Sequence, residues 1–157
     1  MTSIISAVGF CNATGRGDLS TLDSSLKIIA DTGASACEIG IYGEEIISGG
    51  RIIEDRAQRV RDIVRQYAFK KLSLHGQIVS NFMDREHLHL QKKVVRAMLE
   101  LCDRLGAGVL VHHSGNAILS DGMSGSDLDQ MEREALFEMA EIAKTYGVRI
   151  VLENIFT

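Results

Sequence analysis

The sequence lacks long hydrophobic runs, paired cysteines and an excess of basic residues. Its apolar stretches are short and interrupted by charged residues, so it offers no candidate for a transmembrane helix. The first ten residues, MTSIISAVGF, also lack the basic start and extended apolar core of a signal peptide. From these absences we expect a cytoplasmic protein without a membrane partner.

The three cysteines argue against a disulfide-bonded protein and against a zinc finger. Cys11, Cys37 and Cys102 are odd in number and show neither a CxxC motif nor the spacing of a Cys/His finger. This argues against a disulfide framework and against a structural zinc site, and it favours buried thiols. The formal charge of −4 and the isoelectric point near 5.7 give no general attraction to nucleic acid.

What is present is an ordinary globular composition with alternating strand-like and helix-like signals. The 157 residues are 45% hydrophobic and 24% charged, enough for a substantial core, and no linker divides them, so we expect a single domain over residues 1–157. Short apolar runs predict five buried strands. These are Ile4–Cys11, Ala36–Ile41, Lys71–His75, Val109–His113 and Val148–Glu153.

Amphipathic segments between these runs predict crossover helices. Three of the expected helices end at a glycine: Gly33, Gly106 or Gly147. Helix, glycine and strand in repetition indicate an α/β fold with parallel strands. A complete (β/α)8 TIM barrel needs about 250 residues, so the chain corresponds to about the first five βα units. Five strands without closure leave two open sheet edges, from which we expect self-association.

Four potential metal ligands and proton carriers recur near the ends of these strands. Glu38, His75, His113 and Glu153 follow one another at intervals of 37, 38 and 40 residues. Each interval accommodates a strand, a loop and a crossover helix, so the four side chains should lie at the same end of neighbouring strands. Chemistry in α/β sheets and barrels is concentrated at that end.

Each of these residues also has a purely structural interpretation. His75 could be a histidine bonded to a backbone carbonyl, and Glu153 could be a solvated strand terminus. Glu38 could orient substrate or a neighbouring ligand, or form a salt bridge. His112 and His113 must point to opposite faces if both lie in a strand, and the spacing favours His113 for the inner face.

Two segments resemble a known superfamily. LSLHGQIVSNFMDREHLHLQKKVVRAMLELCDRLGAGVLVHHSG and AKTYGVRIVLEN are similar to xylose-isomerase-like TIM barrels, which include sugar isomerases and epimerases, related dehydratases and class II abasic-site endonucleases. In that superfamily, strands three and four often end in a histidine, the latter in a His-x-Gly turn, and strand five ends in a metal-binding glutamate. By motif these are His75, His113 and Glu153, and the chain would be the N-terminal part of such a barrel.

The resemblance implies a divalent-metal-dependent isomerase or epimerase acting on a small-molecule sugar or sugar phosphate. Glu153 would be catalytic and, with His113 and His75, would hold Mn, Co, Mg or Zn. Asn154, Glu38 and the two histidines would bind substrate. The remaining ligands of such epimerases come from strands six to eight, so we expect this chain to have little activity alone.

Two alternatives remain open from the sequence. A zinc-dependent abasic-site endonuclease would use both histidines and Glu153. The acidic balance, the lack of a basic groove segment and Ser114 in place of an expected proline count against it. A non-catalytic barrel remnant is the second alternative, and failure to bind any metal would favour it.

Overall fold

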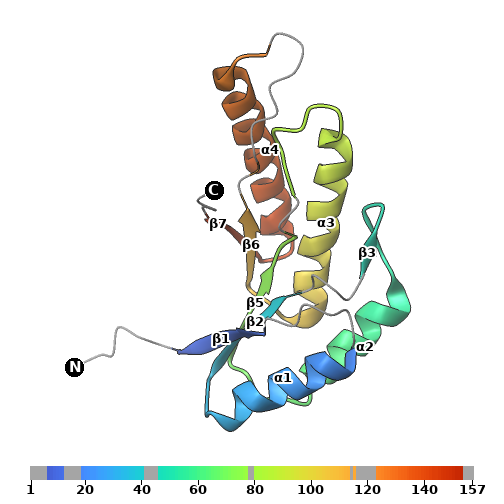
Figure 1. Cartoon of the computed structure of the whole chain (residues 1–157), viewed down its shortest axis with the longest axis vertical. Helices are drawn as coiled ribbons and strands as arrows, with labels where there is room; N and C mark the ends of the chain where they lie inside the picture. The colour runs from blue at the N-terminus through green and yellow to red at the C-terminus, as the bar shows by residue number, and fades with distance from the viewer. Residues whose placement is uncertain are drawn as a thin grey trace, which may run out of the picture.

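The computed structural model describes residues 7–12, 19–40, 46–77, 80–113, 115 and 123–153. Within them, five parallel strands form one sheet in the order β1-β2-β5-β6-β7 (Figure 1). The predicted α/β fold with five parallel strands is therefore confirmed. The strands are β1 (Gly9–Asn12), β2 (Ala36–Gly40), β5 (Lys71–His75), β6 (Val109–His113) and β7 (Arg149–Glu153).

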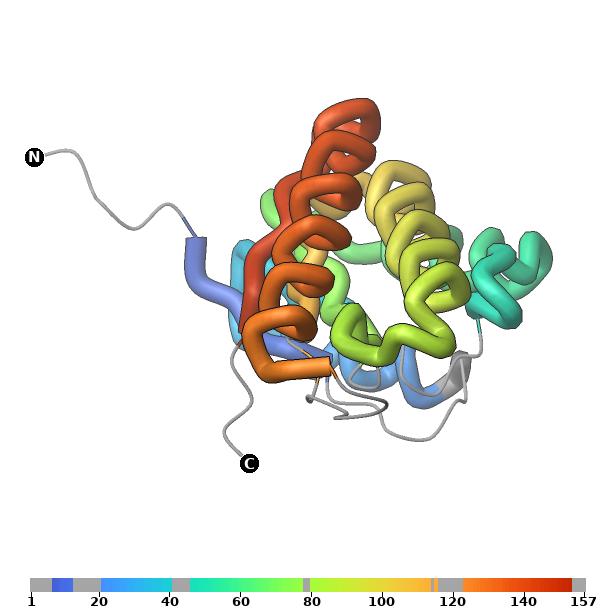
Figure 2. The backbone as a smooth tube through the Cα atoms, turned by 90° about the horizontal axis from the view of Figure 1, so that it is seen from above, coloured from blue at the N-terminus to red at the C-terminus, as the bar shows by residue number. Residues whose placement is uncertain are grey.

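Four helices connect the strands and lie along one side of the sheet (Figure 2). Each crossover returns the chain to the same end of the sheet, so all five strands run parallel. The helices are α1 (Leu19–Asp31), α2 (Glu54–Val64), α3 (Leu88–Leu105) and α4 (Gly125–Thr145).

The predicted boundaries differ from the observed ones by a few residues. Strand β1 begins at Gly9 and extends one residue beyond Cys11, whereas the sequence predicted Ile4–Cys11, of which residues 4–6 lie outside the described part. Helix α3 begins at Leu88, directly after a turn. Hydrophobic periodicity fixes the centre of an element better than its ends.

A two-stranded hairpin between β2 and α2 was not predicted. It consists of β3 (Ile47–Ser48) and β4 (Arg51–Ile52), joined through Gly49 and Gly50 at φ angles of 57° and 75°. At Gly50 a Cβ atom would also lie 2.5 Å from the Cβ of Lys93 in α3. The glycine pair therefore serves both the turn and the close approach of the hairpin to α3.

The hydrophobic core lies between the sheet and the helices. Alternate strand residues such as Cys37, Ile39, Leu74 and Leu110 are buried there against apolar helix positions. The other face of the same strands carries the intervening residues, because side chains alternate along a strand. This second face, which the helices do not cover, bears the polar residues singled out by their spacing.

No described helix is both long and apolar enough to span a membrane.

Candidate metal centre

Strand register brings the four spaced residues to one face of the sheet. Glu38 pairs with Ser73, two residues before His75, and His75 pairs with Val111, two residues before His113. His113 in turn pairs with Glu153. Even offsets keep side chains on the same side of a pleated sheet, so Glu38, His75, His113 and Glu153 all project from the uncovered face.

The two histidines and Glu153 converge at the C-terminal ends of β5, β6 and β7. Nε2 of His75 lies 2.7 Å from Nε2 of His113 and 3.6 Å from Oε2 of Glu153. One ligand atom from each of the three residues lies within 4.8 Å of the other two. The histidine rings are tilted at 43° with their centroids 4.8 Å apart. A single cation could contact all three side chains after small rotamer adjustments.

Glu38 orients His75 from the neighbouring strand. Its Oε1 accepts a hydrogen bond from Nδ1 of His75 at 2.7 Å, and its Oε2 accepts one from the Ser73 hydroxyl at 3.2 Å. Because Nδ1 of His75 donates to the carboxylate, the neutral ring presents a lone pair on Nε2. That lone pair faces His113 and Glu153.

The short contact between the two Nε2 atoms requires a hydrogen atom or a cation between them. Two lone pairs would repel at 2.7 Å, so without a cation the N–H of one ring must donate a hydrogen bond to the other ring. Burial, and next the neighbouring His75, lower the pKa of His113, which favours its neutral form. Its buried Nδ1 has no hydrogen-bond partner within the described part of the chain.

His112 points to the opposite face, as strand alternation requires. Its ring packs against Phe82 with a centroid separation of 4.7 Å, and the residue is 1% exposed. Neither ring nitrogen has a hydrogen-bond partner among the described residues. Burial, with a smaller contribution from His113, lowers the pKa of His112 to about 4. This histidine is therefore a neutral core residue and does not reach the other ligands.

Two glycines allow the loops after β5 and β6 to approach their neighbours. A Cβ at Gly76 would lie 2.5 Å from the carbonyl oxygen of Val111, which accepts the Gly76 amide at 2.7 Å. A Cβ at Gly115 would lie 1.8 Å from Oδ1 of Asn81. That same oxygen accepts the Met83 amide at 2.9 Å, so Asn81 acts in a turn.

Some features of the site escaped the sequence-based interpretation, and one predicted residue lies outside the described residues. Ser73 and Cys11 both lie beside Glu38 on the inner face and were not predicted to belong there. The alternation of β5 could have identified Ser73, two residues before His75. Cys11 was expected to be a buried thiol at the end of the first strand, and this expectation was wrong, because Cys11 is exposed. Asn154, a predicted substrate-binding residue, is not among the described residues.

The chemistry of the donor set fits a divalent cation. Two imidazoles and a carboxylate are one of the ligand sets of catalytic zinc sites, which keep a fourth position open for water or substrate. His75 also carries the outer carboxylate that usually orients a metal-binding histidine. Half of the Glu153 side chain is exposed, which leaves access from solvent.

The chain matches a known protein family over most of its length. Residues 26–157 match the family model described as Xylose isomerase-like TIM barrel. A search of curated proteins gave no significant match.

Solved structures share the fold at low sequence identity. A D-tagatose 3-epimerase-like protein is 23% identical with a TM-score of 0.72, and the alignment covers 96% of this chain and 54% of that one. A xylose isomerase-like TIM barrel protein from Mycobacterium smegmatis in complex with magnesium is 13% identical, with a TM-score of 0.69 and coverages of 93% and 54%. A protein from Thermus thermophilus, soaked with zinc chloride, is 26% identical, with a TM-score of 0.62 and coverages of 87% and 53%. The chain thus spans about half the length of these structures.

Proposed function

Because the chain belongs to the xylose isomerase-like TIM barrel family, we propose that it provides three ligands of the metal centre of a sugar or sugar phosphate isomerase or epimerase. The observation that carries this proposal is the convergence of His75, His113 and Glu153 within 4.8 Å at the C-terminal ends of three adjacent strands. Active sites of TIM barrels are built at that end. The sugar epimerase-like neighbour supports the choice of reaction class.

In the proposed site, Nε2 of His75, Nε2 of His113 and a carboxylate oxygen of Glu153 would hold the ion. Manganese, cobalt, magnesium and zinc are the candidates, and the two imidazoles favour zinc or cobalt over magnesium. Three protein donors are the number found in catalytic zinc sites, where water or substrate completes the coordination. When bound, the ion supplies Lewis-acid polarisation of the substrate carbonyl.

The protein groups would then bind the sugar and move its proton. Glu153 is half exposed and has a second carboxylate oxygen, so it can accept the proton from the carbon next to the carbonyl. His75 and His113 would hold the ion beside the hydroxyl groups of the sugar. The Glu38 carboxylate would keep the His75 ring in one orientation throughout.

A hydrogen-exchange assay tests this proposal even if complete turnover needs groups outside the chain. We would incubate the protein with ketopentoses, ketohexoses and their phosphates in deuterium oxide, with manganese, cobalt, magnesium or zinc. Proton abstraction next to the carbonyl replaces that hydrogen with deuterium, which NMR detects. The proposal predicts exchange that depends on metal and is lost in Glu153→Gln but kept in Glu134→Gln, an exposed control on α4. The absence of metal-dependent exchange with every sugar would contradict it.

A second candidate function is a zinc-dependent abasic-site endonuclease. The nitrogen-rich donor set favours it, because two histidines and a glutamate suit zinc better than magnesium. The net charge of −4 counts against it, since DNA binding gains most of its affinity from basic side chains. Zinc-dependent cleavage of an abasic duplex that weakens steeply with added salt would favour this function over the sugar reaction.

A further inference from the structure

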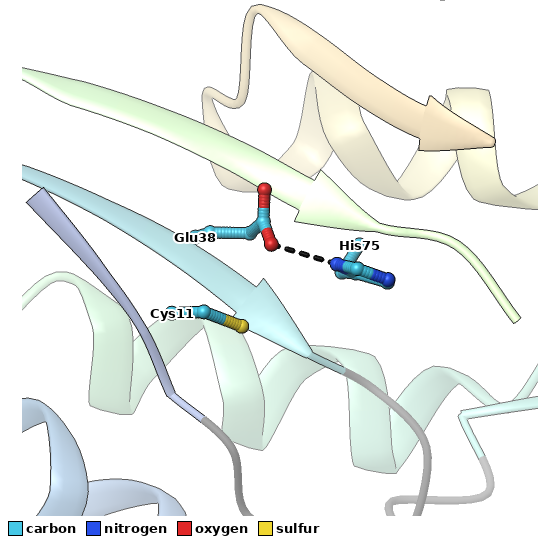
Figure 3. Close-up of side chains that lie close together, drawn as sticks. All are labelled: Cys11, Glu38 and His75. Atoms are coloured by element: carbon cyan, nitrogen blue, oxygen red, sulfur yellow. Dashed lines mark hydrogen bonds and ion pairs between the residues drawn. The ribbon is translucent and has the colours of Figure 1, made fainter. Parts of the chain in front are cut away.

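A second cluster of potential ligands lies on the other side of His75. Figure 3 shows Cys11, Glu38 and His75 gathered over three neighbouring strands, with the Glu38 carboxylate turned toward the histidine ring. The Cys11 sulfur, a Glu38 carboxylate oxygen and a ring nitrogen of His75 all lie within 4.8 Å of one another. In strand register Cys11 pairs with Glu38, which places both side chains on the inner face.

We propose that Cys11, Glu38 and Nδ1 of His75 form a second cation site, selective for zinc and similar thiophilic ions. A thiolate, a carboxylate and an imidazole bind zinc at about 2.0–2.3 Å. A thiolate disfavours magnesium and calcium, which take oxygen ligands. On binding, the thiol proton leaves to solvent and water completes the coordination. The single proton of the neutral His75 ring moves from Nδ1 to Nε2 when the first site is empty. When both sites are filled it leaves to solvent, and the ring bridges the two ions as an imidazolate.

The surroundings of the cluster meet the requirements of a metal site. Cys11 is exposed, and both Cys11 and Glu38 line an open groove on the inner face, so an ion and its water can enter. The Ser73 hydroxyl donates to the second oxygen of Glu38 and fixes the carboxylate from outside. Cys37 and Cys102 are buried and do not belong to the cluster.

The second site can be separated experimentally from the first site, the candidate metal centre of His75, His113 and Glu153. Both sites use His75. Nδ1 of His75 faces Glu38, whereas Nε2 faces His113 and Glu153. A change at Cys11 therefore removes a ligand from the second site only, and a change at Glu153 removes one from the first site only. Excess zinc would occupy the second site and take Glu38 away from its role in orienting His75.

Cobalt titration of the reduced chain tests the proposal, because a cysteine ligand gives a thiolate-to-cobalt charge-transfer band in the near ultraviolet. We expect this band in the wild-type chain, its loss in Cys11→Ser, and its retention in Glu153→Gln. Cys102→Ala is the matched thiol control and should keep the band. Bound zinc, measured after dialysis, should fall from two ions per chain to one in Cys11→Ser and, separately, to one in Glu153→Gln.

Three outcomes would overturn the second site. These are a wild-type chain without the charge-transfer band at saturating cobalt, an undiminished band in Cys11→Ser, and a single bound zinc that Cys11→Ser does not affect. Circular dichroism checks that each variant is folded, and Cys11→Ala provides a second test if the serine variant is unstable. The result is independent of sugar chemistry, since loss of the first site in Glu153→Gln leaves the thiolate band in place.

Discussion

Nε2 of His75 lies 2.7 Å from Nε2 of His113, although the two residues are 38 positions apart in the sequence. The outer nitrogens of the two rings differ in their surroundings. Glu38 accepts the Nδ1 proton of His75, while His113 is buried with its Nδ1 unpartnered among the described residues. The facing nitrogens need a proton or a metal ion between them, and the exposed carboxylate of Glu153 lies beside this position.

The contact between Glu38 and His75 predicts the effect of Glu38→Gln. The amide keeps the size of the side chain but loses the charge that favours one ring orientation and raises the basicity of the ligand. Changes in such outer carboxylates typically lower metal affinity by about 10- to 100-fold. Isothermal titration with manganese measures this at the first site, because manganese disfavours the Cys11 thiolate. An affinity equal to that of the wild type would show that Glu38 does not orient the ligand.

The close approach of Gly76 to β6 predicts that a larger residue at this position lowers both stability and metal affinity. In Gly76→Ala the new Cβ would meet the backbone carbonyl of Val111 at 2.5 Å, so β5 and β6 must separate. Overpacking of this kind costs about 1–3 kcal/mol of unfolding free energy and would move His75 away from His113. Urea denaturation and metal titration measure the two effects.

Gly108→Ala is the matched control for this substitution. A Cβ at Gly108 would have no heavy atom within 4 Å, and its φ angle is not in the left-handed region. We expect wild-type stability and metal affinity in this variant. Equal behaviour of Gly76→Ala and Gly108→Ala would contradict the role given to the close approach at Val111.

The buried His112 predicts loss of stability in weak acid. Its pKa is about 4 in the folded chain, against about 6.5 when unfolded. Between these values the unfolded chain binds a proton that the folded chain does not, so the unfolding free energy falls as the pH falls from about 6.5 to about 4. The full difference is on the order of 3 kcal/mol.

His112→Leu removes this titration and fills the same core position against Phe82. We expect the variant to match the wild type near neutral pH and to exceed it by about 2 kcal/mol near pH 5. Urea denaturation at several pH values gives the comparison, with the exposed His89→Gln as a control. Parallel stability curves for wild type and His112→Leu would contradict the assignment of His112 as a neutral core residue.

Exposed apolar side chains beside β7 predict self-association. Phe137 of α4 is 67% exposed and lines a groove with Leu136, Ile150 and Leu152 at the open edge of the sheet. We expect Phe137→Lys to raise the monomer fraction in light scattering at micromolar concentration, whereas Leu90→Lys on α3 should have a smaller effect. A wild-type chain that is entirely monomeric would contradict this prediction.

The fold could be predicted from the sequence because its signals are local. Gly33, Gly106 and Gly147 adopt positive φ angles just after helices, and each stands before a strand. Such helix ends, followed by short apolar runs, are visible without knowledge of the tertiary structure. The β3–β4 hairpin was missed because strands of two residues are too short to show periodicity.

The site could be predicted in part. Regular spacing indicated that Glu38, His75, His113 and Glu153 occupy neighbouring strands, but spacing does not give the register. The structure shifts His75 two residues beyond the position opposite Glu38, so their contact runs diagonally. The nearness of Cys11 to this pair depends on the register between β1 and β2, which spacing does not give either.

The most direct test of the account is metal binding by the wild-type chain and by His113→Asn and Glu153→Gln, with His87→Asn and Glu134→Gln as controls outside the site. Isothermal titration calorimetry with manganese measures the affinity. We predict one ion per chain in the wild type and both controls, and an affinity at least tenfold lower in His113→Asn and Glu153→Gln. A wild-type chain that binds no divalent ion, or variants that bind as tightly as the wild type, would contradict the proposed metal centre.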